Sequence, residues 1–195
     1  MTIEPSFLLF LAYILGSLPF GFLLTRQAGL GDIRNVGSGN IGATNVLRTG
    51  KKTLAAATLL LDMIKGSCAV GLAFISIPEL APLAGLAALL GHIFPLWLNF
   101  KGGKGVATFI GVLLALYWPL ALMVSLVWLA TALMIHISSL AALLAIASTV
   151  VFIDAFKHYQ LLPAVILMII FITIKHHSNI VRLLAGTEPE IGQHS

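Results

Sequence analysis

The sequence predicts an all-α integral membrane protein with seven transmembrane helices, the N-terminus outside and the C-terminus in the cytoplasm. Of its 195 residues, 59% are hydrophobic and only 9% are charged, whereas soluble domains carry about 25% charged residues. The mean hydropathy is +1.04. Apolar residues gather in runs that suit a hydrocarbon core of about 30 Å, and the basic residues gather in alternate loops. These observations exclude a soluble globular domain.

Turn and charge signals divide the chain into seven predicted crossings. They are residues 6–25, 54–76, 80–98, 105–117, 119–136, 139–156 and 161–178. The first run has no Lys or Arg before it and no small-residue cleavage site after it, so it predicts a retained helix and not a removed signal peptide. Residues 105–153 contain no Asp, Glu, Lys or Arg and would make a helix of about 73 Å. Breaks at 117–119 and 136–139 divide this stretch, extended to 156, into three crossings.

The distribution of basic residues predicts the orientation. With the N-terminus outside, only Lys157 lies in an outer loop and Lys65 lies within a helix. The other nine basic residues then lie on the cytoplasmic side, as the positive-inside rule requires; they are Arg26, Arg34, Arg48, Lys51, Lys52, Lys101, Lys104, Lys175 and Arg182. The net charge of +4 therefore indicates the orientation of the helices and an anionic ligand. It does not indicate nucleic acid.

The polar loop at residues 34–48 predicts a phosphate site. Its glycines (Gly37, Gly39 and Gly42) permit close backbone approach to an anion. Its neutral hydrogen-bonding side chains are Ser38, Asn40, Thr44 and Asn45, and its two arginines, Arg34 and Arg48, offer planar forks for phosphate. The alternative is a loop whose arginines only set the topology and touch lipid headgroups. That alternative explains the charges and leaves the glycines and amides unexplained.

A second group lies at residues 100–105, where Gly102 and Gly103 precede Lys104. The spacing of a Walker loop is absent, which disfavours ATP. Glycines and a lysine at the start of a helix still suit an anion. A basic turn at the membrane interface is an equally good interpretation of this segment alone.

The third group closes the last predicted helix. His176 and Asn179 are three residues apart and share a helical face, so both can address one ligand. A solvated helix end is the alternative. Ser139 begins another helix, where it caps that helix or binds a ligand. Asp62 and Lys65 predict an ion pair facing the bundle interior, and His92 is interpreted as a packing residue.

The predicted topology brings these groups to one face of the membrane. All three groups and Ser139 emerge on the cytoplasmic side, beside an apolar bundle. The predicted ligand is therefore phosphate-bearing and has a lipid-like partner. The sequence predicts no metal site, because no set of metal-ligating residues clusters beside the histidines, and the single cysteine, Cys68, gives no disulfide.

Several stretches together resemble a known family, the bacterial acyl-phosphate-dependent glycerol-3-phosphate acyltransferases (the PlsY family). They are residues 16–21 (GSLPFG), 37–45 (GSGNIGATN), 62–66 (DMIKG), 91–95 (GHIFP), 101–108 (KGGKGVAT), 139–140 and 176–183. They span nearly the whole chain in the family's order. One departure is Lys175, where the family often has arginine.

The resemblance implies one membrane-embedded acyltransferase domain over residues 1–195, in a multi-pass protein of a bacterial inner membrane with its active site on the cytoplasmic side. Its reaction would move a fatty acyl group from acyl phosphate to the sn-1 hydroxyl of glycerol 3-phosphate, giving lysophosphatidic acid and phosphate, the first acylation step of phospholipid biosynthesis. The implied catalytic residues are Ser38, Arg48, Lys104, His176 and Asn179. The implied substrate-binding residues are Gly37, Gly39, Asn40, Gly42, Thr44, Asn45, Gly102, Gly103 and Ser139.

The resemblance implies no cofactor and no metal. It implies as partners the two substrates, membrane lipids and, transiently, the soluble enzyme that makes the acyl phosphate. Because acyl phosphate has a good leaving group and no nucleophile–base–acid set is evident, we expect direct attack without an acyl-enzyme. The main alternative function is a small transporter or channel for an anionic solute. The inverted repeats typical of many transporters are not evident in the sequence.

Overall fold

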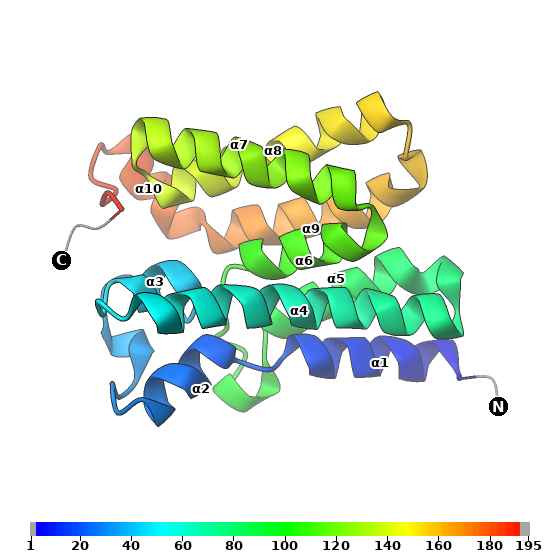
Figure 1. Cartoon of the computed structure of the whole chain (residues 1–195), viewed down its shortest axis with the longest axis horizontal. Coiled ribbons are helices and arrows are strands. Elements are labelled where there is room, and N and C mark those ends of the chain that lie inside the picture. Colours follow the sequence, from blue (N-terminus) through cyan, green and yellow to red (C-terminus); the bar gives the residue numbers. More distant parts are fainter. Residues whose placement is uncertain (1–2, 192–195) are drawn as a thin grey trace.

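Every regular element that the computed structural model describes, over residues 3–191, is a helix (Figure 1). The α-helices are α1 (Pro5–Gly16), α2 (Phe20–Gln27), α3 (Ala43–Leu47), α4 (Lys52–Ser76), α5 (Ala81–Ile93), α6 (Val106–Leu116), α7 (Trp118–Ile135), α8 (Ser138–Phe156), α9 (Leu162–Lys175) and α10 (His177–Leu184). Four short 3-10 helices connect them: η1 (Ile33–Asn35), η2 (Pro78–Leu80), η3 (Leu96–Leu98) and η4 (Tyr159–Leu161). The all-helical prediction is confirmed for these residues.

Five helical segments in the described part of the chain are long and apolar enough to cross a membrane. They are Pro5–Gln27, Lys52–Ser76, Pro78–Leu98, Trp118–Ile135 and Ser138–Phe156. Tyr159–Lys175 and His177–Leu184, which meet at a bend of 62°, make a sixth if the bent pair is one span. The predicted crossing at 105–117 holds only α6, whose 11 residues extend about 17 Å. Seven full crossings and the orientation of the termini therefore stay predictions.

Two of the predicted helices are each divided into two α-helices. The run 6–25 forms α1 and α2, separated at Ser17, Leu18 and Pro19, because Pro19 has no N–H with which to continue the helical ladder. The run 161–178 forms α9 and α10, with His176 at the break. At the first break the carbonyl oxygen of Leu18 accepts a hydrogen bond from Nζ of Lys65.

Glycines allow the helices to approach closely. A Cβ atom on Gly16 of α1 would lie 1.9 Å from the carbonyl oxygen of Ala88 in α5, and one on Gly111 of α6 would lie 2.0 Å from that of Met63 in α4. Small residues at such contacts are typical of helix packing in lipid, where van der Waals contact replaces the hydrophobic effect between helices.

The helices run roughly along the long axis of the molecule (Figure 1). α6 packs against both α4 and α7, and it lies between the part formed by α1, α4 and α5 and the part formed by α7, α8 and α9 (Figure 1). The start of α1 lies at one end of the molecule, while α3, the start of α4 and α10 lie at the other (Figure 1). Large apolar side chains such as Ile75, Leu133 and Met134 are exposed, which suits a hydrocarbon surrounding.

Candidate functional site

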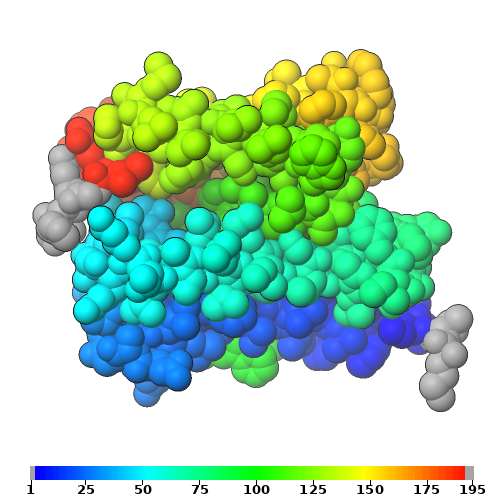
Figure 2. All heavy atoms as spheres, in the orientation of Figure 1, coloured from blue at the N-terminus to red at the C-terminus, as the bar shows by residue number. Residues whose placement is uncertain are grey.

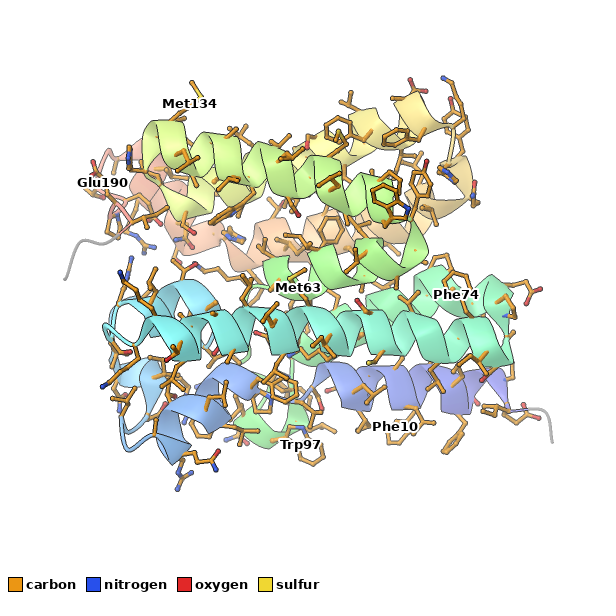
Figure 3. The ribbon with its side chains drawn as sticks, viewed as in Figure 1. Phe10, Met63, Phe74, Trp97, Met134 and Glu190 are labelled. Atoms are coloured by element: carbon orange, nitrogen blue, oxygen red, sulfur yellow. The ribbon has the colours of Figure 1, made fainter. Side chains whose placement is uncertain are left out.

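A cavity of about 710 Å³ opens at the end of the molecule where α3 and α10 lie. Its polar lining includes Ser38, Arg48, Lys104, Ser139, His176 and Asn179. Its apolar lining includes Leu59, Met63, Ile110 and Trp128. Figure 2 shows a depression on this face between the surfaces of α4 and α7, and in Figure 3 Met63 lies near the middle of α4. The cavity thus joins a polar end to an apolar length.

The three residue groups predicted to share one site do line the same cavity. The predicted site residues in its lining are Ser38, Asn40, Gly42, Thr44, Asn45, Arg48, Lys104, Ser139, His176 and Asn179. Four predicted glycines (Gly37, Gly39, Gly102 and Gly103) are not in the lining. Their positions indicate that they shape the loops that carry the others.

Asn45 holds the first loop together. Its Nδ2 donates to the carbonyl oxygens of Ile33 (3.1 Å), Val36 (2.9 Å) and Asn40 (2.8 Å), while its Oδ1 accepts from the backbone N–H of Ser38 (3.0 Å). The side chain is 1% exposed. Its amide is therefore committed to the loop, and its contribution to the cavity is to fix the backbone around Ser38.

Glycine at position 37 lets the arginine of the same loop lie close. Gly37 has φ +53°, a conformation that favours glycine. A Cβ atom there would lie 2.9 Å from Cδ of Arg48 and 2.6 Å from Oδ1 of Asn45. The other arginine of the loop, Arg34, makes an ion pair of 2.6 Å with Asp32 and is not in the cavity lining.

Lys104 follows a turn whose N–H groups are already used. Gly102 donates to the carbonyl of Ile93 and Gly103 to that of His92, each at 3.1 Å. These two N–H groups therefore give no anion nest, contrary to the expectation of glycine contacts with phosphate. Burial lowers the pKa of the Lys104 ammonium to about 8; Glu188 opposes the shift, and Arg182 adds to it.

His176 and Asn179 present hydrogen-bonding groups to the cavity. The Nδ1 of His176 lies 2.8 Å from the carbonyl oxygen of Ile172. Because a carbonyl only accepts, Nδ1 carries the proton, and Nε2 of the neutral ring is the acceptor. Oδ1 of Asn179 is buried and has no hydrogen-bond partner within residues 3–191. Both groups can accept a hydrogen bond from a ligand hydroxyl.

Glu188, which sequence reasoning missed, lies at the centre of this polar end. Its carboxylate accepts hydrogen bonds from Oγ of Ser139 (2.7 Å), from Nδ2 of Asn179 and from Nε of Arg182 (2.7 Å). Its side chain is 6% exposed. Burial raises the pKa of this carboxyl, but the three hydrogen bonds outweigh burial and hold the pKa below its usual value. Glu188 therefore anchors the segment after α10 as a carboxylate.

The predicted pair of Asp62 and Lys65 is confirmed, with 2.7 Å between Oδ1 and Nζ. His92 extends the pair, since its Nδ1 lies 3.6 Å from the same oxygen. Asp62 and His92 both line the cavity, so the prediction of a purely packing role for His92 was incomplete. Among residues 3–191 no group of three or more His, Cys, Asp or Glu residues is arranged to hold a metal ion.

Comparisons with known proteins agree with this geometry. The profile of a family described as "Glycerol-3-phosphate acyltransferase" matches residues 6–186. A glycerol-3-phosphate acyltransferase of Mesorhizobium japonicum is 56% identical over 192 residues, covering 98% of each chain. One of Brucella anthropi is 54% identical, covering 97% of this chain and 98% of the relative.

The fold matches solved structures equally well. The crystal structure of PlsY (YgiH), an integral membrane glycerol 3-phosphate acyltransferase, in its glycerol 3-phosphate form has a TM-score of 0.91 at 39% identity, covering 96% of this chain and 95% of that one. The lysophosphatidic acid form has a TM-score of 0.89 at 37% identity, with the same coverage. The resemblance inferred from the motifs is confirmed: this integral membrane protein belongs to the glycerol-3-phosphate acyltransferase family.

Proposed function

We propose that this protein transfers a fatty acyl group from acyl phosphate to the sn-1 hydroxyl of glycerol 3-phosphate, on the cytoplasmic side of a bacterial inner membrane. The observation that carries the proposal is the cavity itself, whose cationic end continues into an apolar length. A lipid-forming transfer needs both, because one substrate is a small anion and the other carries a hydrocarbon chain. The glycerol 3-phosphate and lysophosphatidic acid forms of the related PlsY structures support the acceptor and the product.

The residues divide into three roles. Ser38, Arg48 and Lys104 would hold phosphate groups, since a guanidinium fork and an ammonium both suit phosphate oxygens. His176 and Asn179 would bind the glycerol part through their acceptor atoms, and Ser139 lines the same end. The apolar lining, which includes Leu59, Met63, Ile110 and Trp128, would hold the acyl chain.

The proposed mechanism is a direct attack. The sn-1 oxygen forms a bond to the acyl carbon, and the bond from that carbon to the phosphate oxygen breaks with its electron pair leaving on phosphate. The hydroxyl proton passes to the donor's own phosphate or to Nε2 of His176. Lys104 and Arg48 would stabilise the negative charge on the leaving phosphate, and holding both substrates together supplies much of the rate enhancement.

The donor is tested with purified protein in lipid nanodiscs. Glycerol 3-phosphate is given with acyl phosphate, acyl-CoA or an acyl carrier protein thioester in separate reactions, and lysophosphatidic acid is measured. Product from acyl phosphate alone is the expected result. Product from a thioester and not from acyl phosphate would reject the proposed donor.

The absence of an acyl-enzyme is tested by labelling. Protein incubated with radiolabelled acyl phosphate and no acceptor is quenched in acid, and the protein band is counted. We expect no covalent label above that of the Lys104→Ala variant. Stoichiometric label that glycerol 3-phosphate removes would replace direct attack by a two-step mechanism.

The cellular setting follows from the chemistry. The reaction would be the first acylation step of phospholipid biosynthesis, and the protein would receive acyl phosphate through transient contact with the soluble enzyme that makes it. Family membership favours acyl transfer over the alternative of an anion transporter. Proteoliposomes that take up glycerol 3-phosphate without acylating it would support transport instead.

A further inference from the structure

Three buried charged or titratable side chains in α4 and α5 have no role in the proposed reaction. Asp62, Lys65 and His92 are 2%, 3% and 3% exposed. Polar side chains inside a membrane bundle are costly and are commonly functional. The pair of Asp62 and Lys65 balances its own charge, which leaves the placement of His92 to be explained.

The imidazole of His92 lies between the ion pair and the turn that carries Lys104. On one side its Nδ1 faces Oδ1 of Asp62 at 3.6 Å. On the other side the ring lies against Gly103, because a Cβ atom added there would be 2.1 Å from Nε2 and 2.8 Å from Cε1. The backbone N–H of Gly103 also donates to the carbonyl oxygen of His92 at 3.1 Å.

Gly102 is held against the same residue. A Cβ atom on Gly102 would lie 2.1 Å from the carbonyl oxygen of His92, and its N–H donates to the carbonyl of Ile93. The turn before α6 therefore rests on the last turn of α5 at two successive glycines. Lys104 is the next residue, and it lines the cavity.

The support continues to the break in the first predicted crossing. Nζ of Lys65 donates to the carbonyl oxygen of Leu18 at 2.8 Å, an oxygen at the break between α1 and α2. A chain of contacts thus runs from that break through Lys65, Asp62 and His92 to the turn that carries Lys104. It joins α4, α5 and the approach to α6 below one cationic side chain.

We propose that His92, oriented by Asp62, is a positioning residue that sets the place of Lys104 in the cavity. Its ring supports the Gly102–Gly103 turn and does not itself contact substrate. Because displacement of a catalytic group by about 1 Å costs up to about 100-fold in rate, loss of the ring acts on the reaction through Lys104.

A double-mutant cycle tests this inference, which rests on the proposed acyl-transfer function. We measure kcat/KM, per amount of folded protein, for His92→Ala, Lys104→Ala and the double variant. We expect His92→Ala to lower kcat/KM about 10-fold to 100-fold. The double variant should equal Lys104→Ala within about twofold, because removing the His92 ring has no further effect once the Lys104 ammonium is absent. Multiplicative losses would overturn the proposal and would indicate direct contact between His92 and substrate.

A size exchange between His92 and Gly103 gives an independent readout. Gly103→Ala alone places a methyl group on the ring, so we expect a loss of at least about tenfold in kcat/KM. Combined with His92→Ala the methyl group has space, and we expect at least threefold recovery relative to Gly103→Ala alone. Absence of recovery would contradict the contact on which the inference depends.

Two controls distinguish loss of the positioning role from general destabilisation of the protein and from failure of the proposed function. Leu113→Ala removes a fully buried side chain of α6 outside the cavity lining, and it should change kcat/KM per folded protein by less than about twofold while lowering the unfolding temperature. If the unsubstituted protein forms no lysophosphatidic acid, the proposed function fails. If it is active and the cycle is multiplicative, only the positioning role fails.

Discussion

The charge of Lys104 depends on the residues that surround it in the site. It follows the two glycines docked on His92 and lies among Arg48, Lys175 and Arg182, with Glu188 as the opposing charge. Burial, with these cationic neighbours adding to it, lowers the pKa of its ammonium below that of an exposed lysine. A substrate phosphate would reverse this, since an opposite charge favours the cationic form.

The pH dependence of kcat/KM should report the free Lys104. Burial lowers its pKa to about 8, so the cation is complete below that pH and is lost as the pH rises through it. We expect kcat/KM to fall above pH 8 and to approach a tenfold loss per pH unit. In Lys104→Arg the fall should move to higher pH, because a guanidinium keeps its charge. An unchanged alkaline limb in that variant would exclude Lys104 as its source.

Removing the positive charge of Lys104 or Arg48 altogether should lower kcat/KM strongly. We expect Lys104→Ala or Arg48→Ala to lower kcat/KM on the order of 100-fold, the size of effect found when one group that stabilises developing charge is removed. The measurement is lysophosphatidic acid formation at saturating acyl phosphate and varied glycerol 3-phosphate, with thermal unfolding in detergent as the check on folding. Turnover close to that of the unsubstituted protein would reject these roles.

Glu188→Gln should weaken the site by releasing its polar end. The substitution keeps the shape of the side chain and removes the negative charge of the carboxylate that accepts hydrogen bonds from Ser139, Asn179 and Arg182. Hydrogen bonds to a charged group contribute about 1.5–3 kcal/mol, and the half-exposed Arg182 reduces that range here. We expect kcat/KM to fall about tenfold. Glu79→Gln, an exposed glutamate of η2, is the control and should leave kcat/KM unchanged; equal behaviour of the two variants would contradict the anchoring role.

At the residue scale, the sequence predicted the side chains that would bind substrate better than the side chains that hold them in place. Arg48, Lys104 and His176 were predicted from their chemistry and from a shared cytoplasmic position, and the cavity brings them together. Glu188 carries no local signal, because its partners belong to α8 and α10 and meet it only after folding. For the same reason the pattern could not tell that the amide of Asn45 faces inward, to the loop's own carbonyls.

At the scale of helices, close contact between α4 and α6 depends on glycines in both helices, Gly66 and Gly111. A Cβ atom on Gly111 would lie 2.0 Å from the carbonyl oxygen of Met63, and because that obstacle is backbone, the helices themselves would have to separate. Oγ of Ser67 donates to the carbonyl of Gly111 at 2.7 Å, and separation would break this bond too.

Gly111→Ala should therefore destabilise the fold. We expect a loss of about 1–3 kcal/mol, the usual cost of overpacking, seen as a lower unfolding temperature in detergent. Gly71→Ala on α4 is the matched control, because nothing lies within 4 Å of its added Cβ and alanine favours a helix. A Gly111→Ala protein as stable as the control would show that the two helices separate at little cost.

The limits of the sequence prediction are different for helices. Apolar runs predicted where helices occur, and each predicted crossing contains one. Hydropathy does not register a bend, so the breaks after Gly16 and at His176 were missed, although Pro19 was a visible signal for the first. At His176 no Pro or Gly marks the 62° bend, so the sequence carried no signal for the second break.

For the whole molecule, α6 decides the orientation. It begins beside the cavity and its 11 residues are short for a crossing. If the chain passes through the membrane there, the prediction of an odd number of crossings holds and the segment after α10 lies in the cytoplasm. If it does not, residues 157–160 and the segment after α10 exchange sides, and Glu188 would then lie on the opposite face of the membrane from Ser38, although both line the same cavity.

Cysteine labelling distinguishes the two arrangements. In a Cys68→Ser background, which removes the single native cysteine, the exposed residues Lys51, Glu79, Gln160 and Thr187 are each replaced by cysteine and treated with an impermeant maleimide on intact spheroplasts. We expect label at positions 79 and 160 without lysis and at 51 and 187 only after lysis, because Lys51 and Thr187 flank the cationic cavity and the positive-inside rule puts that end in the cytoplasm. Each variant must retain acyl transfer, which reports a native arrangement. Label at 187 but not at 160 before lysis would mean that α6 does not cross, and the two ends of the chain could not then line one cavity open to cytoplasmic glycerol 3-phosphate.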